Sequence, residues 1–152
     1  MQRVDIDDVE PTTMGSDIDR RGLSDPLGTT DFAVNRYRLE PGERFSEALH
    51  AHMDQEEVFV VVEGEAVFET TGDPVTVGSG EAVRFAPGEF QSGRNDGDGE
   101  LLAFAMGAPR DSEDVRIPQP CPECDQENVR AVPADEGFDL VCPECGTEVS
   151  AD

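Results

Sequence analysis

Apolar positions between residues 31 and 107 fall in short runs, separated by turn sequences such as Pro-Gly, Gly-Asp-Pro and Gly-Ser-Gly. Short runs bounded by turn residues at regular intervals are typical of the strands of an all-β sandwich or barrel. No run has the length and spacing of a long amphipathic helix. The pattern therefore predicts an all-β fold, with strands over residues 32–39, 58–62, 66–71, 75–77, 82–85 and 101–106.

The run over residues 58–62 reads Val-Phe-Val-Val-Val and does not alternate between apolar and polar positions. A strand with one face in solvent alternates, whereas a strand covered on both faces is apolar throughout. We therefore expect this strand to be covered on both faces, as a central strand of a two-sheet barrel or a strand at a dimer contact would be.

The chain outside this region has a different character. Residues 1–30 form a polar, Asp-rich arm, in which Val4 and Ile6 alternate as in an edge strand. An ordered covering segment and a loose tail are equally compatible with that composition. Residues 110–120 are a polar spacer, since its two prolines block a helix and favour extended chain. The predicted organisation is the arm 1–30, a barrel 31–109, the spacer 110–120 and a cysteine-containing segment 121–150.

The net charge of the chain bears on which partners it can bind. The chain has 35 acidic residues against 11 basic ones, all arginine, and a net charge of −24. A surface this negative repels phosphate backbones and anionic lipid headgroups, so we expect no nucleic-acid and no membrane partner. The composition resembles that of haloarchaeal proteins. Because concentrated salt screens such charges, we expect a halophilic protein that is more stable at high salt.

Two features of the sequence bear on the expected location of the protein and on the redox state of its cysteines. No apolar stretch approaches the roughly 20 residues of a membrane span, and residues 1–10 are acidic instead of basic and then apolar. We therefore expect a cytoplasmic protein. That compartment keeps thiols reduced, so its four cysteines argue for a metal site and against disulfides.

The cysteines form two Cys-x-x-Cys pairs, Cys121 with Cys124 and Cys142 with Cys145. Two such turns aim four thiolates at one point and complete a closed tetrahedral site, which indicates a structural zinc ribbon over residues 121–150. The few apolar residues of this segment could not hold a fold without the metal. An iron site of rubredoxin type uses the same turns, and a redox dithiol would normally need only one pair near a helix. Zinc is favoured by spacing and by ligand softness.

The charge of the ribbon bears on its role. Residues 110–152 hold 12 acidic and 3 basic residues, which makes nucleic-acid binding a poor fit. A contact surface for a protein partner, or a purely stabilising role, fits better.

A second candidate site contains both histidines of the chain. His50 and His52 are separated by one residue and are followed by Glu56 and Glu57. Side chains two residues apart on a strand share a face, so both imidazoles can point into a barrel, where a carboxylate from the next strand completes a two-His-one-carboxylate set. Such a set binds a metal. The alternative is a pair of surface histidines that lie beside a glutamate by chance.

These residues carry a family resemblance. Pro41-Gly42, then His50-x-His52, four residues, Glu57, six residues and Gly64, resembles the first motif of the cupin superfamily. The segment 80–88, Gly-Glu-Ala-Val-Arg-Phe-Ala-Pro-Gly, followed by Asn95, is similar to the second motif. The resemblance covers about residues 30–108 and does not extend to the ribbon. It implies a small jelly-roll-like barrel that commonly dimerises and holds one divalent metal, so the expected fold is a cupin-like barrel followed by a zinc ribbon.

Carried over residue by residue, the resemblance implies His50, His52 and Glu57 as ligands of Fe, Mn, Ni or Zn. Glu57 is chosen over Glu56 because its distance to the following glycine fits the motif and alternation puts Glu56 on the other face. Where the second motif usually has a third histidine, this chain has Gln91. We expect Gln91 to be a weak oxygen ligand or a hydrogen-bond partner of a ligand, and metal affinity to be lower.

Two functions fit this pattern, and a third fits less well. A metalloenzyme of oxygenase or isomerase type would use the open coordination positions for a small-molecule substrate. A non-catalytic cupin would bind a small ligand or sense metal, with the ribbon as a contact surface for a partner. A structural barrel whose site has decayed agrees poorly with both histidines and the glutamate standing in one motif. Barrels of this kind host unrelated chemistries, so the fold does not decide between them.

Overall fold

The computed structural model describes residues 1–12 and 17–151. Helices in these residues are short: a 3-10 turn at Ile6–Asp8 and α1 at Ser24–Leu27. No helix of the described ranges is long and apolar enough to cross a membrane. The barrel strands are β1 (Asp19–Gly22), β2 (Ala33–Leu39), β3 (Ala51–His52), β4 (Glu56–Glu63), β5 (Glu65–Thr70), β6 (Val75–Gly78), β7 (Ala82–Phe85), β8 (Gln91–Asn95) and β9 (Leu101–Ala108). They are followed by β10 (Val115–Ile117), β11 (Val129–Pro133), β12 (Phe138–Val141) and β13 (Glu148–Val149).

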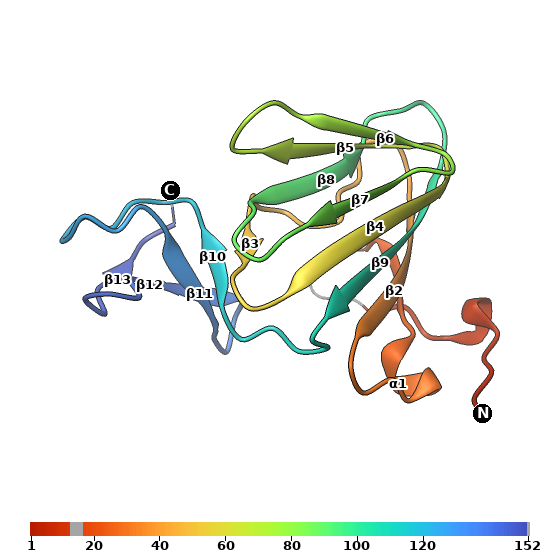
Figure 1. Ribbon diagram of the computed structural model, residues 1–152, viewed down its shortest axis with the longest axis horizontal. Coiled ribbons are helices and arrows are strands. Elements are labelled where there is room, and N and C mark those ends of the chain that lie inside the picture. The colour runs from red at the N-terminus through yellow and green to blue at the C-terminus, as the bar shows by residue number, and fades with distance from the viewer. Residues whose placement is uncertain (13–16, 152) are drawn as a thin grey trace.

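Two antiparallel sheets form the barrel. One has the order β1-β2-β9-β4-β7 and the other the order β6-β5-β8, and Figure 1 shows them facing each other. Their inward side chains make one apolar core, in which the rings of Phe45 and Phe68 stack with centroids 5.7 Å apart. Phe59 packs on Phe68 with centroids 4.8 Å apart. The all-β barrel expected from the turn-bounded runs is thus confirmed.

Strand β4 differs in one respect from the expectation for its apolar run. Phe59 and Val61 face inward and are buried, whereas Val58 and Val60 face outward and are half-buried, and Val62 is 42% exposed. The outward valines lie beside residues of neighbouring strands in the same sheet, with Val58 opposite Met106. Strand β4 is thus fully covered on its inner face and only partly covered on its outer face.

The arm adds an edge strand, but at β1 and not at Val4 and Ile6. Both backbone pairing with β2 and ion pairs with Arg36 hold the arm against the sheet. Arg36, on the outer face of β2, is 3% exposed and forms ion pairs with Asp7 at 3.1 Å and Asp19 at 3.2 Å. A buried guanidinium needs such partners, so the arm is folded over the sheet at this point.

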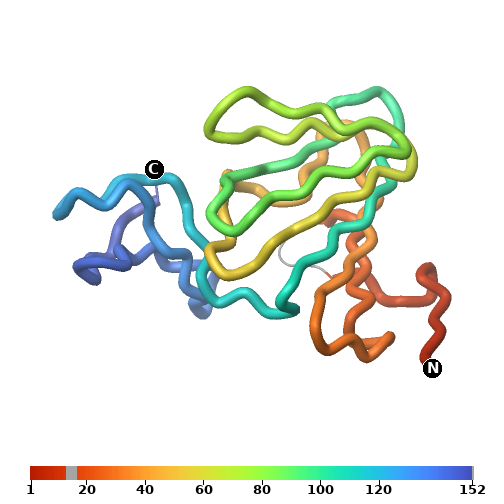
Figure 2. The backbone as a smooth tube through the Cα atoms, in the orientation of Figure 1, coloured from red at the N-terminus to blue at the C-terminus, as the bar shows by residue number. Residues whose placement is uncertain are grey.

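The C-terminal part, here called the cysteine module (residues 115–151), continues the barrel by backbone pairing. Its strands form the sheet β13-β12-β11-β10-β3, in which β10 lies against the short barrel strand β3. Val115 pairs with His52 and Arg116 with Ala51. Residues 110–120, expected to be a spacer, therefore contain a strand. In Figure 2 the cysteine module lies at one end of the molecule and the N-terminus at the other.

Candidate metal centres

The barrel brings together His50, His52 and Glu57, whose candidate ligand atoms all lie within 4.8 Å of one another. The imidazole centroids are 5.1 Å apart, and Nε2 of His52 lies 3.6 Å from Oε2 of Glu57. His52 is the last residue of β3, His50 lies just before that strand, and Glu57 is at the start of β4. Two segments that follow each other in the chain thus supply three donors to one point.

Strand alternation selects the glutamate. Glu57 faces inward, in register with Phe85 of β7. Its neighbour Glu56 faces outward and accepts a 2.6 Å hydrogen bond from Nε of Arg84. Only one of the two adjacent carboxylates therefore reaches the histidines.

The histidine rings are oriented through their Nδ1 atoms. Nδ1 of His50 lies 2.9 Å from the carbonyl oxygen of Ala48. A carbonyl only accepts, so this nitrogen carries the proton and Nε2 of His50 keeps its lone pair. Nδ1 of His52 lies 2.9 Å from Oγ of Ser112, a residue of the connector (residues 109–114) between barrel and cysteine module.

Gln91 completes the floor of this group. It is 2% exposed, and its backbone pairs with that of His50 through N–O distances of 2.9 and 3.2 Å. Its Nε2 donates to Oε2 of Glu57 at 3.0 Å. Its Oε1 is buried with no hydrogen-bond partner in the described part of the chain. Two imidazole nitrogens, a carboxylate and an orphaned amide oxygen are a donor set that fits a divalent first-row metal.

Burial shifts the titration of these groups toward their neutral forms. Desolvation raises the pKa of Glu57 to about 7, although the hydrogen bond from Gln91 opposes it. Desolvation, and next the nearby His50, lower the pKa of His52 to about 4. Desolvation also lowers the pKa of His50. The 3.6 Å contact between His52 and Glu57 has the distance of an ion pair, but without a metal burial favours two neutral groups.

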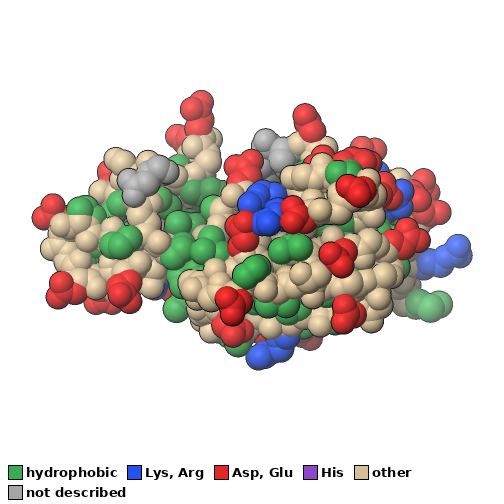
Figure 3. Space-filling model, turned by 90° about the horizontal axis from the view of Figure 1, so that it is seen from above, with side chains coloured by type: hydrophobic (Ala, Val, Ile, Leu, Met, Phe, Trp, Pro, Cys, Tyr) green, Lys and Arg blue, Asp and Glu red, His purple; other side chains and the backbone are tan. Residues whose placement is uncertain are grey.

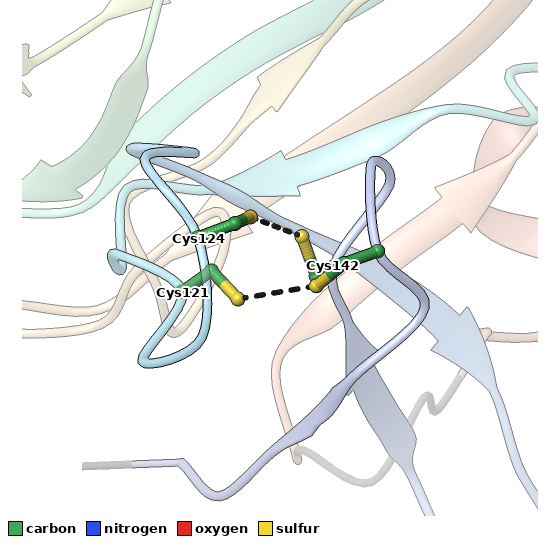
Figure 4. A group of neighbouring side chains, drawn as sticks. Cys121, Cys124 and Cys142 are labelled. Atoms are coloured by element: carbon green, nitrogen blue, oxygen red, sulfur yellow. Dashed lines mark hydrogen bonds between the residues drawn. The ribbon is translucent and has the colours of Figure 1, made fainter.

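The cysteine module brings its four cysteines together from two turns (Figure 4). The sulfurs of Cys121 and Cys145 are 3.6 Å apart, and those of Cys124 and Cys142 are 3.5 Å apart. Zn–S bonds of about 2.3 Å in a tetrahedron place sulfurs about 3.8 Å apart, close to this spacing. The arrangement fits one tetrahedral metal ion.

Hydrogen bonds shape the two cysteine turns. The amide of Cys121 donates to the carbonyl of Gln126, and that of Cys142 to the carbonyl of Thr147, each at 2.8 Å. The hydroxyl of Thr147, followed by its backbone amide, lowers the pKa of Cys145 to about 6. The backbone of Gln126 lowers the pKa of Cys124, but neighbouring thiols, Cys142 first, raise it overall to about 12. Crowded thiols resist joint ionisation, and a bound cation removes that conflict.

Another polar pair lines the barrel interior. Tyr37 belongs to the buried core, and its hydroxyl accepts a 2.9 Å hydrogen bond from Nε of Arg20 on β1. The guanidinium carbon of Arg20 lies 5.8 Å from the centre of the tyrosine ring. Burial raises the pKa of Tyr37. Arg20 stands in the acidic arm, so no local pattern pointed to it as an inward-facing cation.

Sequence reasoning also missed Ser112, which contacts His52, and Asp54, which accepts a hydrogen bond from Ser112. Asp54 stands within the motif and could have been noticed, but Ser112 is 60 positions from His52 and carries no local signal. It reaches the site because β10 pairs with β3.

Comparison with known proteins agrees with this geometry. A family model described as "Cupin domain" matches residues 35–107. No curated protein matches the chain.

Several solved structures share the fold. A sugar phosphate isomerase of the cupin superfamily from Silicibacter pomeroyi is 22% identical, with 98% of this chain and 97% of that chain covered and a TM-score of 0.73. A conserved protein with a double-stranded β-helix domain from Klebsiella pneumoniae is 21% identical, with 74% and 94% covered and a TM-score of 0.60. A predicted oxalate decarboxylase from Thermotoga maritima is 23% identical, with 70% and 98% covered and a TM-score of 0.60. Residues 35–107 therefore match the cupin domain model, and the barrel has a cupin-like fold.

Proposed function

We propose that the barrel holds one divalent metal ion through His50, His52 and Glu57, with Gln91 as a weaker oxygen ligand, and uses it to bind a small oxygen-rich molecule. The observation that carries this proposal is the convergence of the three donors within 4.8 Å of one another. Gln91 is hydrogen-bonded to Glu57, and its Oε1 is buried and has no hydrogen-bond partner in the described part of the chain. An unsatisfied buried acceptor costs about 1–3 kcal/mol, and a nearby cation relieves that cost.

The side chains at this site have different roles in the proposed metal binding. His50 and His52 offer neutral nitrogen donors, and Glu57 offers the one negative charge, oriented by the amide of Gln91. When bound, the metal supplies Lewis-acid polarisation of a coordinated oxygen. Four protein donors at most leave room for a chelating ligand on Fe, Mn, Ni or Zn.

The substrate class we propose is a small anionic molecule with adjacent oxygen atoms. Adjacent oxygen atoms suit the open coordination positions, because a chelating ligand binds a divalent metal through two oxygens. The names of two structural neighbours, a sugar phosphate isomerase and a predicted oxalate decarboxylase, also refer to anionic, oxygen-rich molecules. Isomerase or oxygenase chemistry on such a molecule would make the protein a metalloenzyme.

A non-catalytic ligand-binding or regulatory cupin is the second candidate. It is favoured by Gln91, because an amide oxygen is a weaker ligand than the histidine that the second cupin motif usually has there. Turnover of sugar phosphates, diketones and hydroxy acids by metal-loaded protein would support the enzyme. Tight binding of these compounds with no turnover would support the second candidate.

In the cysteine module we propose structural zinc bound by Cys121, Cys124, Cys142 and Cys145 in a reducing, cytoplasmic setting. The clustering of the four thiols, with two sulfur–sulfur distances of 3.5 and 3.6 Å, supports a closed site with no position for a substrate. A protein partner of this module stays a prediction.

A homodimer, expected from the resemblance, also stays a prediction. It is supported by the half-buried row of outward apolar side chains that includes Val58, Val60 and Phe104 on neighbouring strands. Light scattering on the purified protein tests it: twice the chain mass is expected, and the mass of one chain would contradict it.

The two adjacent glutamates give a matched test of the barrel site. Calorimetric titration with Co²⁺ or Mn²⁺ should show one barrel site in the wild type and in Glu56→Gln, whose side chain points outward. Glu57→Gln should weaken it by more than the roughly 10–100-fold that loss of an outer hydrogen-bond partner costs. Equal affinities of Glu57→Gln and Glu56→Gln would refute the proposed site.

A further inference from the structure

His52 is contacted by a residue that no cupin motif in this sequence contains. Ser112, in the connector, places its Oγ 2.9 Å from Nδ1 of His52. The same hydroxyl donates its single proton to Oδ1 of Asp54 at 2.6 Å. Toward His52 the oxygen can then only accept, so the proton between them belongs to Nδ1. Nε2 of His52 is left with the lone pair that faces Glu57.

Asp54 is itself held in place by the connector. Its second oxygen, Oδ2, accepts hydrogen bonds from the backbone amides of Glu113 at 2.7 Å and Asp114 at 3.2 Å. Backbone amides only donate, so both oxygens of Asp54 act as acceptors, one toward the connector backbone and one toward Ser112. The amide of Met53 also donates to the carbonyl of Asp114 at 2.8 Å. Met53 and Asp54, which follow His52, are thus both hydrogen-bonded to the connector.

The two histidines differ in what orients them. Nδ1 of His50 donates to the carbonyl of Ala48, a contact two residues away that needs no distant segment. The hydrogen-bond partner of Nδ1 of His52 is Ser112, which lies near His52 because the following strand, β10, pairs with β3. A ring freed from Ser112 could carry its proton on Nε2 and donate it to Glu57, 3.6 Å away. That arrangement would block the nitrogen that a metal needs.

We propose that Ser112, oriented by Asp54, is a positioning residue that fixes His52 as the Nδ1–H tautomer and so keeps Nε2 open to a ligand. The connector to the cysteine module then contributes to the barrel site by orienting one of its histidines. The metal consequence rests on the proposed function, whereas the tautomer assignment does not. Outer partners that fix a ligating histidine are typically worth about 10–100-fold in metal affinity.

The tautomer can be read directly, because the chain has only two histidines. In ¹⁵N-labelled, barrel-metal-free protein at about pH 8, where imidazoles are neutral, long-range ¹H–¹⁵N spectra separate Nδ1–H from Nε2–H rings. Both rings of the wild type should be Nδ1–H. Ser112→Ala and Asp54→Ala should each give His52 substantial Nε2–H character and leave His50 unchanged, which makes His50 the internal control.

Two further variants separate positioning from general damage. Ser112→Thr keeps the hydroxyl and should retain the Nδ1–H ring. Ser79→Ala, which removes a hydroxyl bonded to Val62 in a turn outside both sites, should behave as the wild type. Co²⁺ titration should show a loss of about 10–100-fold in Ser112→Ala and little loss in Ser112→Thr.

Failure of this inference and failure of the proposed function give different results. A wild-type barrel that binds no metal overturns the proposed function, but the tautomer spectra still decide the role of Ser112. A Ser112→Ala protein with an unchanged far-UV spectrum and an unchanged Nδ1–H ring at His52 would overturn the inference. The same holds if Ser112→Thr behaves like Ser112→Ala.

Discussion

Nε2 of Gln91 donates a 3.0 Å hydrogen bond to Oε2 of Glu57, and Oε1 of the same amide is buried without a hydrogen-bond partner in the described part of the chain. The opposite orientation of the amide would set its oxygen against the carboxylate. The hydrogen bond therefore determines which atom of Gln91 remains free. The amide that carries this free oxygen is bonded to Glu57, one of the three clustered donors.

Replacing Gln91 should change barrel metal affinity in a direction set by the new side chain. Gln91→Leu removes both the donor to Glu57 and the free oxygen, so affinity should fall by about tenfold or more. Gln91→His supplies an imidazole, a better ligand for these metals, and should raise affinity. Co²⁺ titration of both variants checks this. An unaltered affinity in Gln91→Leu would show that the amide takes no part in the site.

Removing a thiolate should unfold the cysteine module selectively. Cys142 is 1% exposed, and the module has little apolar core besides Val129. Cys142→Ser should therefore lose zinc, and the amides of β11 and β12 should lose protection in hydrogen exchange. The amides of β4 and β9 in the barrel core should stay protected. Retained zinc, or equal loss of protection in both parts, would argue against a separate structural site.

Acid should weaken the contact between the connector and the module. Arg116 donates a pair of hydrogen bonds to Asp114, the longer at 2.8 Å, and thereby lowers the pKa of Asp114 below its ordinary 3.8. A carboxyl with a depressed folded-state pKa stabilises the fold above pH 3.8, and this stabilisation is lost as pH falls through the lower, folded value.

The matching experiment compares Asp114→Asn with the wild type in urea at several pH values. The free energy of unfolding should differ by about 0.5–1 kcal/mol near pH 7, and the difference should shrink toward zero in strong acid. Asp125→Asn, at an exposed carboxylate, is the control and should differ little. A difference that grows as pH falls would have the wrong sign for this account.

Salt should stabilise the protein. With 35 acidic and 11 basic residues, like charges crowd the surface, and Figure 3 shows acidic side chains spread over the face in view. Raising KCl from about 0.1 M to about 1 M shortens the Debye length from about 10 Å to about 3 Å and weakens this repulsion. The thermal midpoint should therefore rise with KCl. A midpoint that is flat or falls would contradict the halophilic interpretation.

Local patterns predicted the strands whose side chains are apolar. The run over residues 82–85 coincides with β7, and the run over 101–106 lies within β9. Strand β8, Gln-Ser-Gly-Arg-Asn, was missed because its buried side chains are polar. Asn95 there donates to the carbonyl of Leu39 at 2.9 Å, and Gly93 is required because a Cβ would lie 2.5 Å from the ring of Phe68. Only the tertiary structure shows those partners.

Both candidate metal groups were visible in the sequence because their ligands recur at short, fixed spacings. The polar contacts that distant segments add to the barrel were not visible. Ser112 and Arg20 reach the barrel through strand pairings, β10 on β3 and β1 on β2, that join polar segments with little β pattern. Such pairing requires a strand edge with free backbone groups in a distant part of the chain. A short stretch of sequence therefore cannot reveal it.

The central claim is that the chain carries two separate metal sites. Metal content per chain, measured by inductively coupled plasma mass spectrometry on protein purified in high salt without chelator or affinity metal, tests it most directly. The account predicts about one zinc and about one further metal in the wild type, one for each group of donors. His50→Ala should lose only the further metal and keep the zinc. Zinc alone in the wild type, at about one equivalent, would contradict the barrel site.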